Sequence, residues 1–231
     1  MSLFGQGLFE ALRLLVTGDP EVWQITWLSL QISATATLLS LLVGVPIGAL
    51  LALSRFPGRA LAVSLVNTGM GLPPVVVGLF VTIVLWRNGA LGFLELLYTP
   101  TAMVVGQLVI AAPIVTGLTL AAVQQVPEAF RRQMLGLGAS RVQMTWVLLK
   151  EARLPMLAAV MAGFGGVISE VGASMMLGGN IKGSTRVLTT ATVLETGKGN
   201  FDIAIALSVI LLVITFLVNW ALSWIQQRSR A

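Results

Sequence analysis

The sequence predicts an all-α integral membrane protein with five transmembrane helices and one further helix that lies along the membrane surface. Hydrophobic residues make up 56% of the 231 residues and charged residues only 10%, whereas roughly a quarter of the residues in soluble domains are charged. The hydrophobic residues also form runs longer than the ~18 residues that mark a spanning helix. Because these runs leave no segment for a soluble domain, we expect one transmembrane domain over residues 1–231.

Five hydrophobic runs give the five predicted spans. Their approximate bounds are 25–53, 61–85, 100–123, 156–178 and 203–225. About 20 helical residues cross the hydrocarbon of a bilayer, so the first run is longer than a span requires. We expect that helix to tilt or to extend into one interface, with Pro46 as the residue where it would kink.

The N-terminal segment predicts a helix that lies in the membrane interface. Gln6, Glu10, Arg13 and Thr17 recur at helical spacing on one face, and apolar residues occupy the remaining surface. The segment lacks the basic start of a secretory signal, so we expect it to be retained. A frayed apolar tail is the alternative for the same pattern.

The distribution of cations predicts the orientation in the cell membrane. One side carries Arg55, Arg59, Arg131, Arg132, Arg141, Lys150, Arg153, Arg228 and Arg230. The other side carries Arg13, Arg87, Lys182, Arg186 and Lys198. Lysine and arginine are enriched in cytoplasmic loops, so the first side is cytoplasmic, which places the N-terminus outside and the C-terminus inside.

The composition excludes most kinds of chemistry within this chain. Histidine and cysteine are absent, so Ser-His and Cys-His nucleophilic pairs and the usual zinc ligand sets cannot form. No phosphate-binding G-x-x-x-x-G-K-[ST] motif occurs either. The net charge of +5 follows from cytoplasmic retention of cations and does not indicate a nucleic-acid partner. We therefore expect no catalytic residue, no metal site and no cofactor in this chain.

The connection between the third and fourth spans, residues 124–155, is far longer than the 2–8 residues typical of helix connections. Pro127 and Glu128 indicate a helix start, Gly136 and Gly138 indicate its end, and Ser140 can cap a second short helix. We expect two short helices joined by a corner of small residues, which we call the elbow (residues 136–141). An amphipathic helix pair that rests on lipid headgroups is the alternative.

The segment VPEAFRRQMLGLGASRVQMTWVLLKEARLP (residues 126–155) resembles the cytoplasmic loop of ABC importer permeases. In that family the loop is a coupling helix that docks in a cleft of the ATPase subunit, and Gly138 stands at the position of its glycine. The resemblance assigns the ATPase contact to Glu128, Arg131, Arg132, Gly136, Gly138, Ala139, Ser140 and Arg141. This sequence has Arg132, Gln133 and Met134 where the family has Glu-Ala-Ala, so Arg132 does not take the role of that glutamate.

A second segment, ISEVGASMMLGGNIKGSTRVLTTATVLETGKGNFDIAIALS (residues 168–208), resembles oxyanion importer permeases of the molybdate and sulfate kind and most closely their tungstate branch. The resemblance implies a type I ABC importer permease fold and a tetrahedral oxyanion as substrate, tungstate first, with molybdate or sulfate as alternatives. It also implies an external solute-binding protein and two ATPase subunits that bind ATP and Mg. Five helices cannot easily enclose a hydrated path while also burying their small-residue faces, so we expect a homodimer with the path at its seam.

Within this second segment we expect Glu170, Gly172, Ser174 and Met175 to form part of the path or its gate. Glu170 is the only acid well inside a span, and such residues are functional candidates by default. A carboxylate would repel an anionic substrate, so we expect it to bond to neighbouring helix termini or hydroxyls. The glycines of the fourth span form a small-residue face suited to close helix packing, either within one subunit or at a subunit seam.

The loop that follows carries three polar residues, Asn180, Lys182 and Arg186, on the predicted outer side. The two cations could attract an oxyanion or hold an acidic lobe of a binding protein. Simple solvation is the alternative.

Two functions of other classes remain compatible with the residues alone. A self-contained anion channel or ion-coupled carrier would move the anion without partners, although only Glu170 offers a titratable group within a span. A membrane scaffold would move nothing.

Overall fold

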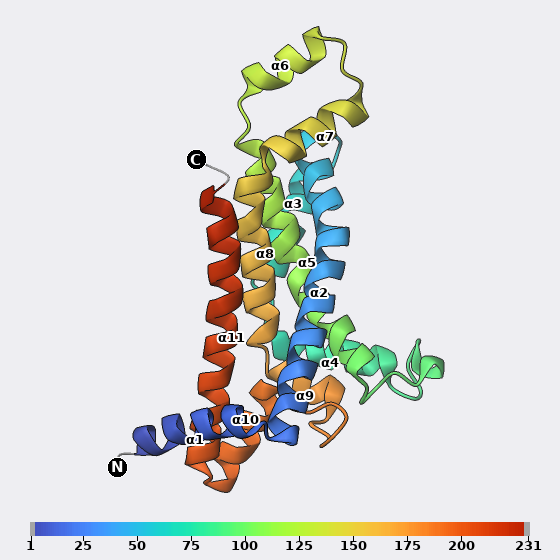
Figure 1. The fold of residues 1–231 in the computed structure, drawn as a ribbon. Coiled ribbons are helices and arrows are strands. Elements are labelled where there is room, and N and C mark those ends of the chain that lie inside the picture. The colour runs from blue at the N-terminus through green and yellow to red at the C-terminus, as the bar shows by residue number, and fades with distance from the viewer. Residues whose placement is uncertain (1–2, 229–231) are drawn as a thin grey trace.

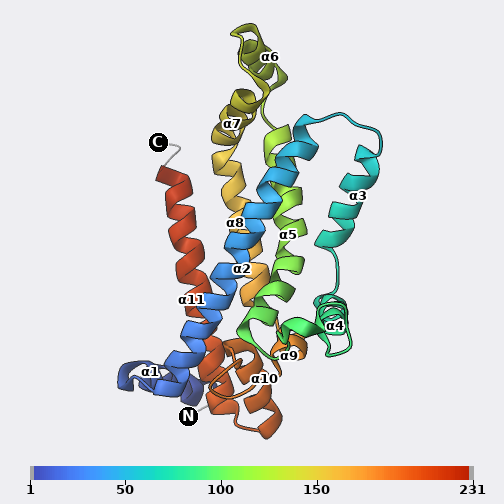
Figure 2. The ribbon, with the colours of Figure 1, turned by 90° about the vertical axis from the view of Figure 1, so that its right-hand side faces the viewer.

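The computed structural model describes residues 3–228, and within that range it contains helices and no strands. Four helices lie side by side along the long axis of the molecule (Figure 1): α2 (Pro20–Leu53), α5 (Pro100–Gln124), α8 (Arg153–Ile168) and α11 (Phe201–Arg228). A fifth upright helix, α3 (Arg59–Met70), stands on the other side of α5 from α11 (Figure 2). The all-helical fold class is confirmed.

Shorter helices occupy the two ends of this bundle. One end, which we call the loop end, carries α6 (Glu128–Gly136) and α7 (Arg141–Glu151). The opposite end carries α1 (Leu3–Thr17), α4 (Pro74–Leu85), the 3-10 helix η1 (Gly92–Leu94), α9 (Gly172–Gly178) and α10 (Leu188–Lys198). The residues predicted to act on opposite sides of the membrane therefore lie at opposite ends of the molecule.

Two of the five predicted transmembrane helices are broken. The helices α2, α5 and α11 are each long and apolar enough to cross a membrane, and they match the predicted first, third and fifth spans. The predicted helix 61–85 is instead α3 and α4, bent by 103°, and the predicted helix 156–178 is α8 and α9, bent by 58°. A count of five spans therefore requires each bent pair to form one span.

The break between α3 and α4 has a local cause. Pro73 and Pro74 have no backbone N–H, and proline disfavours helical geometry in the residue before it. Pro74 becomes the first residue of α4, a position at which the missing N–H leaves no helical bond unmade. Beyond the break, α4 crosses α9 so closely that a Cβ on Gly78 would lie 2.8 Å from the Cα of Ala173.

The helices α2 and α5 form the most extensive contact in the bundle. Gly44 and Gly48 lie one turn apart on the face of α2 that meets α5. A Cβ added to Gly44 would lie 2.8 Å from Cγ1 of Val115, and one added to Gly48 would lie 2.5 Å from the carbonyl oxygen of Thr116. Small residues at such spacing allow two backbones in a membrane to approach closely.

Replacing Gly48 with leucine should therefore separate α2 from α5 and lower the yield of folded protein several-fold. The measurement is the monodisperse fraction after detergent extraction, by size-exclusion chromatography. Gly165→Leu is the control, because a Cβ at Gly165 would meet no other described element within 4 Å. Equal yields from the two variants would contradict this account of the α2–α5 contact.

The small-residue face of α8 packs mainly on α5 of the same chain. A Cβ on Gly163 would lie 3.2 Å from Val115 of α5, and one on Gly166 would lie 3.6 Å from Ile114. Gly165 is the glycine of α8 whose Cβ position has no neighbour within 4 Å on the other described helices.

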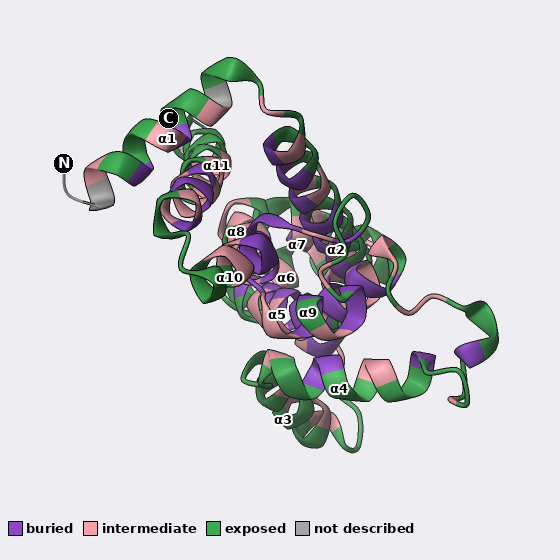
Figure 3. Ribbon diagram, turned by 90° about the horizontal axis from the view of Figure 1, so that it is seen from below, coloured by how far each residue is buried: buried purple, intermediate pink, exposed green. Residues whose placement is uncertain are grey.

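The predicted N-terminal helix is present as α1 and lies across the end of α11 (Figure 3). Ala11 is buried, and Gly7 lies so close to Ile205 of α11 that a Cβ there would be 2.4 Å from its side chain. Leu8, Phe9, Leu12 and Val16 are exposed. A helix with one face on the bundle and an exposed apolar face fits the membrane interface.

Candidate functional site

The predicted site residues fall in three separate places. The ATPase-contact residues lie on α6, the elbow and α7, at the loop end. Of the predicted path residues, Glu170 lies at the break between α8 and α9, and the other three lie in α9. The predicted docking residues lie on the loop between α9 and α10, residues 179–187. In the described part of the chain, no group of three acidic residues could hold a metal ion.

The elbow begins with a Schellman motif that ends α6. The N–H of Gly138 donates to the carbonyl of Leu135 at 3.0 Å, and the N–H of Ala139 donates to that of Met134 at 3.1 Å. Gly138 has a φ of 79°, the left-handed conformation that this motif requires and that L-residues with a Cβ disfavour. The prediction that glycine ends α6 is therefore correct, because the turn that ends this helix needs a residue in the left-handed conformation.

The elbow ends with a capping box that starts α7. The backbone N–H of Gln143 donates to Oγ of Ser140 at 3.3 Å, and Oε1 of Gln143 accepts from the N–H of Ser140 at 2.8 Å. Two backbone donors at the helix start are satisfied in this way. The elbow is thus a defined turn between two capped helices, as the sequence predicts.

The loop is anchored to the bundle by a buried apolar cluster. Leu148 of α7 is fully buried against Val123 and Val126 at the end of α5, and Phe130 of α6 packs on the same cluster. Arg131 adds a polar anchor, since its Nη2 donates to the carbonyl of Val123 at 2.7 Å. Because close-packed clusters transmit displacement, a force on α7 would reach α5.

The tip of the loop presents an exposed apolar surface. Leu137 is 74% exposed and Val142 is 79% exposed, and Leu135 and Trp146 are exposed as well. The charged residues of the tip add little rigidity, because the pair between Arg132 and Glu128 is itself exposed. The loop therefore has an anchored base and an exposed apolar tip.

The break between α8 and α9 is organised by Glu170, which is only 7% exposed. Its Oε1 accepts from the backbone N–H of Ala173, in the first turn of α9, at 2.8 Å. Its carbonyl accepts from the hydroxyl of Thr189 at 3.0 Å. The carboxylate thus bonds to a helix terminus, as the sequence analysis expected.

Polar side chains surround Glu170 inside the chain. Ser174 is buried, and its hydroxyl lies 3.4 Å from Nε2 of Gln107 on α5. Oε1 of Gln107 is buried without a hydrogen-bond partner among residues 3–228. A cavity of about 10 Å³, lined by Ser29, Ser33, Gln107, Glu170 and Thr189 among others, adjoins it and has room for about one water molecule.

The other two predicted path residues differ in exposure. Gly172 packs on α4, where a Cβ would lie 2.6 Å from Val75, whereas Met175 is exposed. The sequence analysis did not identify Gln107, although a lone amide within the apolar run 100–123 was a usable signal.

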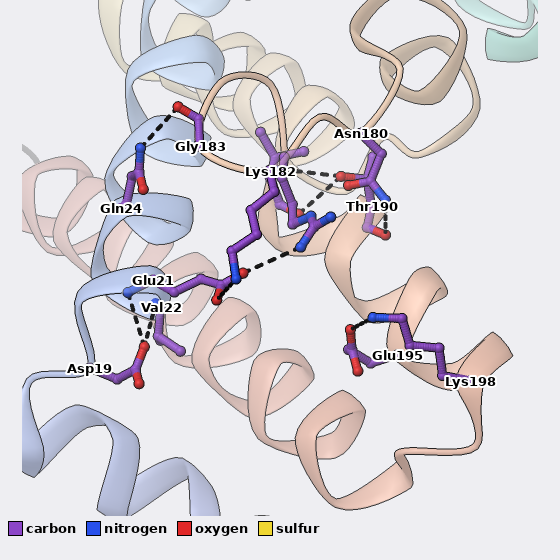
Figure 4. Close-up of polar contacts among 12 residues, drawn as sticks. Asp19, Glu21, Val22, Gln24, Asn180, Lys182, Gly183, Thr190, Glu195 and Lys198 are labelled. Carbon is purple, nitrogen blue, oxygen red and sulfur yellow. Dashed lines mark hydrogen bonds and ion pairs between the residues drawn. The ribbon is translucent and has the colours of Figure 1, made fainter.

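The two predicted docking cations share one carboxylate (Figure 4). Nζ of Lys182 lies 2.6 Å from Oε2 of Glu21, and Nη1 of Arg186 lies 3.3 Å from Oε1 of the same residue. Gln24 of α2 also donates to the carbonyl of Gly183 at 3.1 Å. The start of α2 therefore holds the α9–α10 loop, and Lys182 and Arg186 are not simply solvated.

Replacing Glu21 with alanine should loosen this loop and leave the bundle intact. Exposed ion pairs contribute about 0–1 kcal/mol, and the N–H of Leu188 still donates to Ser29 at 2.8 Å. We expect faster amide hydrogen exchange in residues 181–187 with an unchanged thermal midpoint. Glu10→Ala is the control, because Glu10 forms an ion pair at the same end with Arg13, which is not part of the loop. Unchanged exchange in the Glu21 variant would contradict the anchoring role.

Two hydrogen bonds shift the pKa of Glu195, which lies on α10. Hydrogen bonds from Lys198 and Asn200 hold the pKa of Glu195 below its ordinary value, against a smaller effect of burial. A lowered folded-state pKa stabilises the fold above the unfolded-state pKa, and this contribution is lost as pH falls through the folded-state value. The contact among these three residues should therefore persist at neutral pH and weaken only in acid.

Comparisons with known proteins agree with this arrangement. Residues 44–231 match the family model of the binding-protein-dependent transport system inner membrane component. The chain is 38% identical over 227 residues to the tungstate uptake system permease protein TupB of Peptoclostridium acidaminophilum, covering 98% of this chain and 100% of that protein. It is 42% identical over 200 residues to a probable anion ABC transporter permease protein of Haloferax volcanii, covering 84% and 86% of the two chains.

Among solved structures, the fold resembles a chain of the MetNI methionine ABC transporter in an inward-facing conformation. The TM-score is 0.74 at 20% sequence identity, and the match covers 91% of this chain and 98% of that one. At this identity the likeness establishes the fold.

Proposed function

Because this chain belongs to the family of binding-protein-dependent transport system inner membrane components, we propose that it is the membrane-spanning subunit of an ATP-driven importer for a tetrahedral oxyanion, with tungstate as the first candidate. The choice of tungstate as substrate rests on one observation, the similarity to a tungstate uptake permease, which covers 98% of this chain and 100% of that protein. Molybdate and sulfate are the alternative substrates.

ATP and Mg bind to two separate ATPase subunits in this proposal. The loop supports such a division of labour, because its base is packed on α5 and its tip presents Leu137, Val142 and Trp146 to a partner. An apolar surface surrounded by charged side chains is typical of a protein interface. The ATPase would receive the elbow, and its movement would pass through α7 into the bundle.

The translocation path lies at the seam between two copies of the chain. Within one copy the polar cavity beside Glu170 measures only about 10 Å³, too small for a tetrahedral oxyanion. A two-fold homodimer can form the path by combining the same surface of both copies. Alternating access then arises when the two halves rock against each other.

The opposite end faces outward and receives the solute-binding protein, which selects the ion. This orientation follows from the excess of lysine and arginine at the loop end. Lys182, Arg186 and Asn180 line the outer loop, and Glu21 holds both cations in place. An acidic lobe of the binding protein would compete with Glu21 for them.

Uptake by proteoliposomes tests the proposal. Vesicles that contain this chain, its ATPase and the binding protein should accumulate labelled tungstate when ATP is present, and omission of any one component should abolish accumulation. Parallel assays with molybdate and sulfate rank the substrates. Flux through the chain alone would indicate a channel or carrier, and absence of flux under every condition would indicate a scaffold.

A further inference from the structure

We infer that four arginines at the loop end form a binding site for the phosphate headgroup of an anionic phospholipid. The site is a cavity of about 540 Å³ between the α2–α3 connection, the end of α5 and α6. Arg55, Arg59, Arg131 and Arg132 line it, and Glu128 is its only acidic residue. The sequence analysis used Arg55 and Arg59 only to assign the orientation, and it assigned Arg131 and Arg132 to the ATPase contact as well.

The arginines keep donor groups available for a ligand. Arg59 uses Nε to bond the carbonyl of Leu51 at 2.7 Å, and Arg131 uses Nη2 to bond that of Val123 at 2.7 Å. These bonds fix two guanidinium groups at the ends of α2 and α5, and neither group has a carboxylate partner in the described chain. Arg55 has no hydrogen bond or ion pair to any of residues 3–228. A guanidinium fork matches the oxygens of a phosphate.

The cavity lies at the depth of the lipid headgroups. The 25 residues of α5 span about 37 Å, somewhat more than the ~30 Å thickness of the hydrocarbon, so its two ends reach the headgroup layers. Gln124, the last residue of α5, lines the cavity. Basic pockets at the cytoplasmic ends of transmembrane helices bind anionic lipid headgroups.

Apolar residues provide a place for the rest of the lipid. Leu53, Val126 and Met144 line the cavity together with the arginines. Next to it, Leu61 and Leu65 of α3 are exposed, and α3 packs on α5 at the edge of the bundle (Figure 2). A phospholipid can place its phosphate at the arginines and an acyl chain along α3, whereas a free phosphate would use only the charged part.

The inference goes beyond the proposed function. A lipid here would tie the α2–α3 connection, the start of α3 and α6 to the bilayer, because Arg55 lies in the connection, Arg59 begins α3, and Arg131 and Arg132 lie on α6. The orientation decides only which leaflet supplies the lipid.

Native mass spectrometry of the purified full-length chain, titrated with phosphatidylglycerol or phosphatidylcholine, tests the site. We expect tighter binding of phosphatidylglycerol. The double variant Arg55→Gln/Arg132→Gln, which spares the two arginines that hold helix ends, should weaken phosphatidylglycerol binding by about fivefold for each arginine removed. The control Arg141→Gln/Arg153→Gln removes the same charge outside the cavity and should change binding by less than about twofold.

Three results would overturn the inference. One is equal affinity for the two lipids, and another is an equal loss in the control variant, which would indicate general surface charge. The third is displacement of phosphatidylglycerol by millimolar inorganic phosphate or tungstate, which would indicate a site for free anions. Thermal midpoints of all variants separate lost binding from lost folding. The assay needs no ATPase or nucleotide, so its failure would leave the proposed importer function unaffected.

Discussion

Replacing Gly138 with tryptophan should leave insertion and folding of the bundle intact and reduce ATP-driven uptake at least about tenfold. The left-handed conformation of Gly138, with a φ of 79°, costs a residue with a Cβ about 1–2 kcal/mol, and the indole would also project from the elbow into the space that an ATPase must occupy. Apart from its two chain neighbours, no residue among 3–228 has an atom within 4 Å of the position of a Cβ at Gly138, so the bundle itself has no reason to unfold.

The measurement is uptake per ATP hydrolysed by the reconstituted complex. Gly58→Trp is the matched control, because Gly58 has a φ of 85°, has no neighbour within 4 Å of its Cβ position and lies on the α2–α3 connection at the same end. We expect that variant to retain uptake. Normal uptake by the Gly138 variant, or equal losses in both, would contradict docking through the elbow.

Substitution of Glu170 should have the second large effect, on stability and assembly. Two substitutions separate its role as a hydrogen-bond acceptor from the role of its negative charge. Glu170→Gln keeps an acceptor for the N–H of Ala173, so folding and uptake should stay within about twofold of the parent protein. Glu170→Leu leaves that buried N–H without a partner, a loss of about 1–3 kcal/mol. We expect a lower thermal midpoint in detergent and less assembled complex for the leucine variant alone.

One result for the glutamine variant would contradict this structural role of Glu170. If the glutamine variant has an unchanged thermal midpoint and no uptake, the negative charge takes part in transport, and a bond to the start of α9 does not explain why an acid is buried there. The Ser174→Ala variant is the control for polar packing nearby, because the contact between Ser174 and Gln107 is long at 3.4 Å.

Features encoded by neighbouring residues could be predicted from the sequence. Gly138 ends α6 and Ser140 starts α7 through bonds that reach only a few positions along the chain. The break between α3 and α4 is also encoded locally, by Pro73 and Pro74. The prediction of one continuous helix over 61–85 was wrong because it followed the apolar run and ignored these prolines. Hydropathy measures burial in lipid, whereas proline acts on the backbone.

Features that join distant segments could not be predicted in the same way. Glu21 meets Lys182 across 161 positions, and Gln107 meets Ser174 across 67. The apolar residues of the loop also divide between two surroundings, since Phe130 and Leu149 pack on the bundle while Leu137, Val142 and Trp146 stay exposed. Which apolar residue faces inward depends on where the loop meets α5, and periodicity does not contain that information.

The absence of cysteine allows the central claim, that a separate ATPase acts through the elbow, to be tested with single introduced thiols. Leu137→Cys places one at the exposed tip, and Phe93→Cys places one at the opposite end, where Phe93 is 76% exposed. In the assembled complex, a short bifunctional reagent should link position 137, and not position 93, to the ATPase subunit, and that link should stop tungstate uptake. A complex that accumulates tungstate normally with no link at 137, or with the link fully formed, would contradict the account.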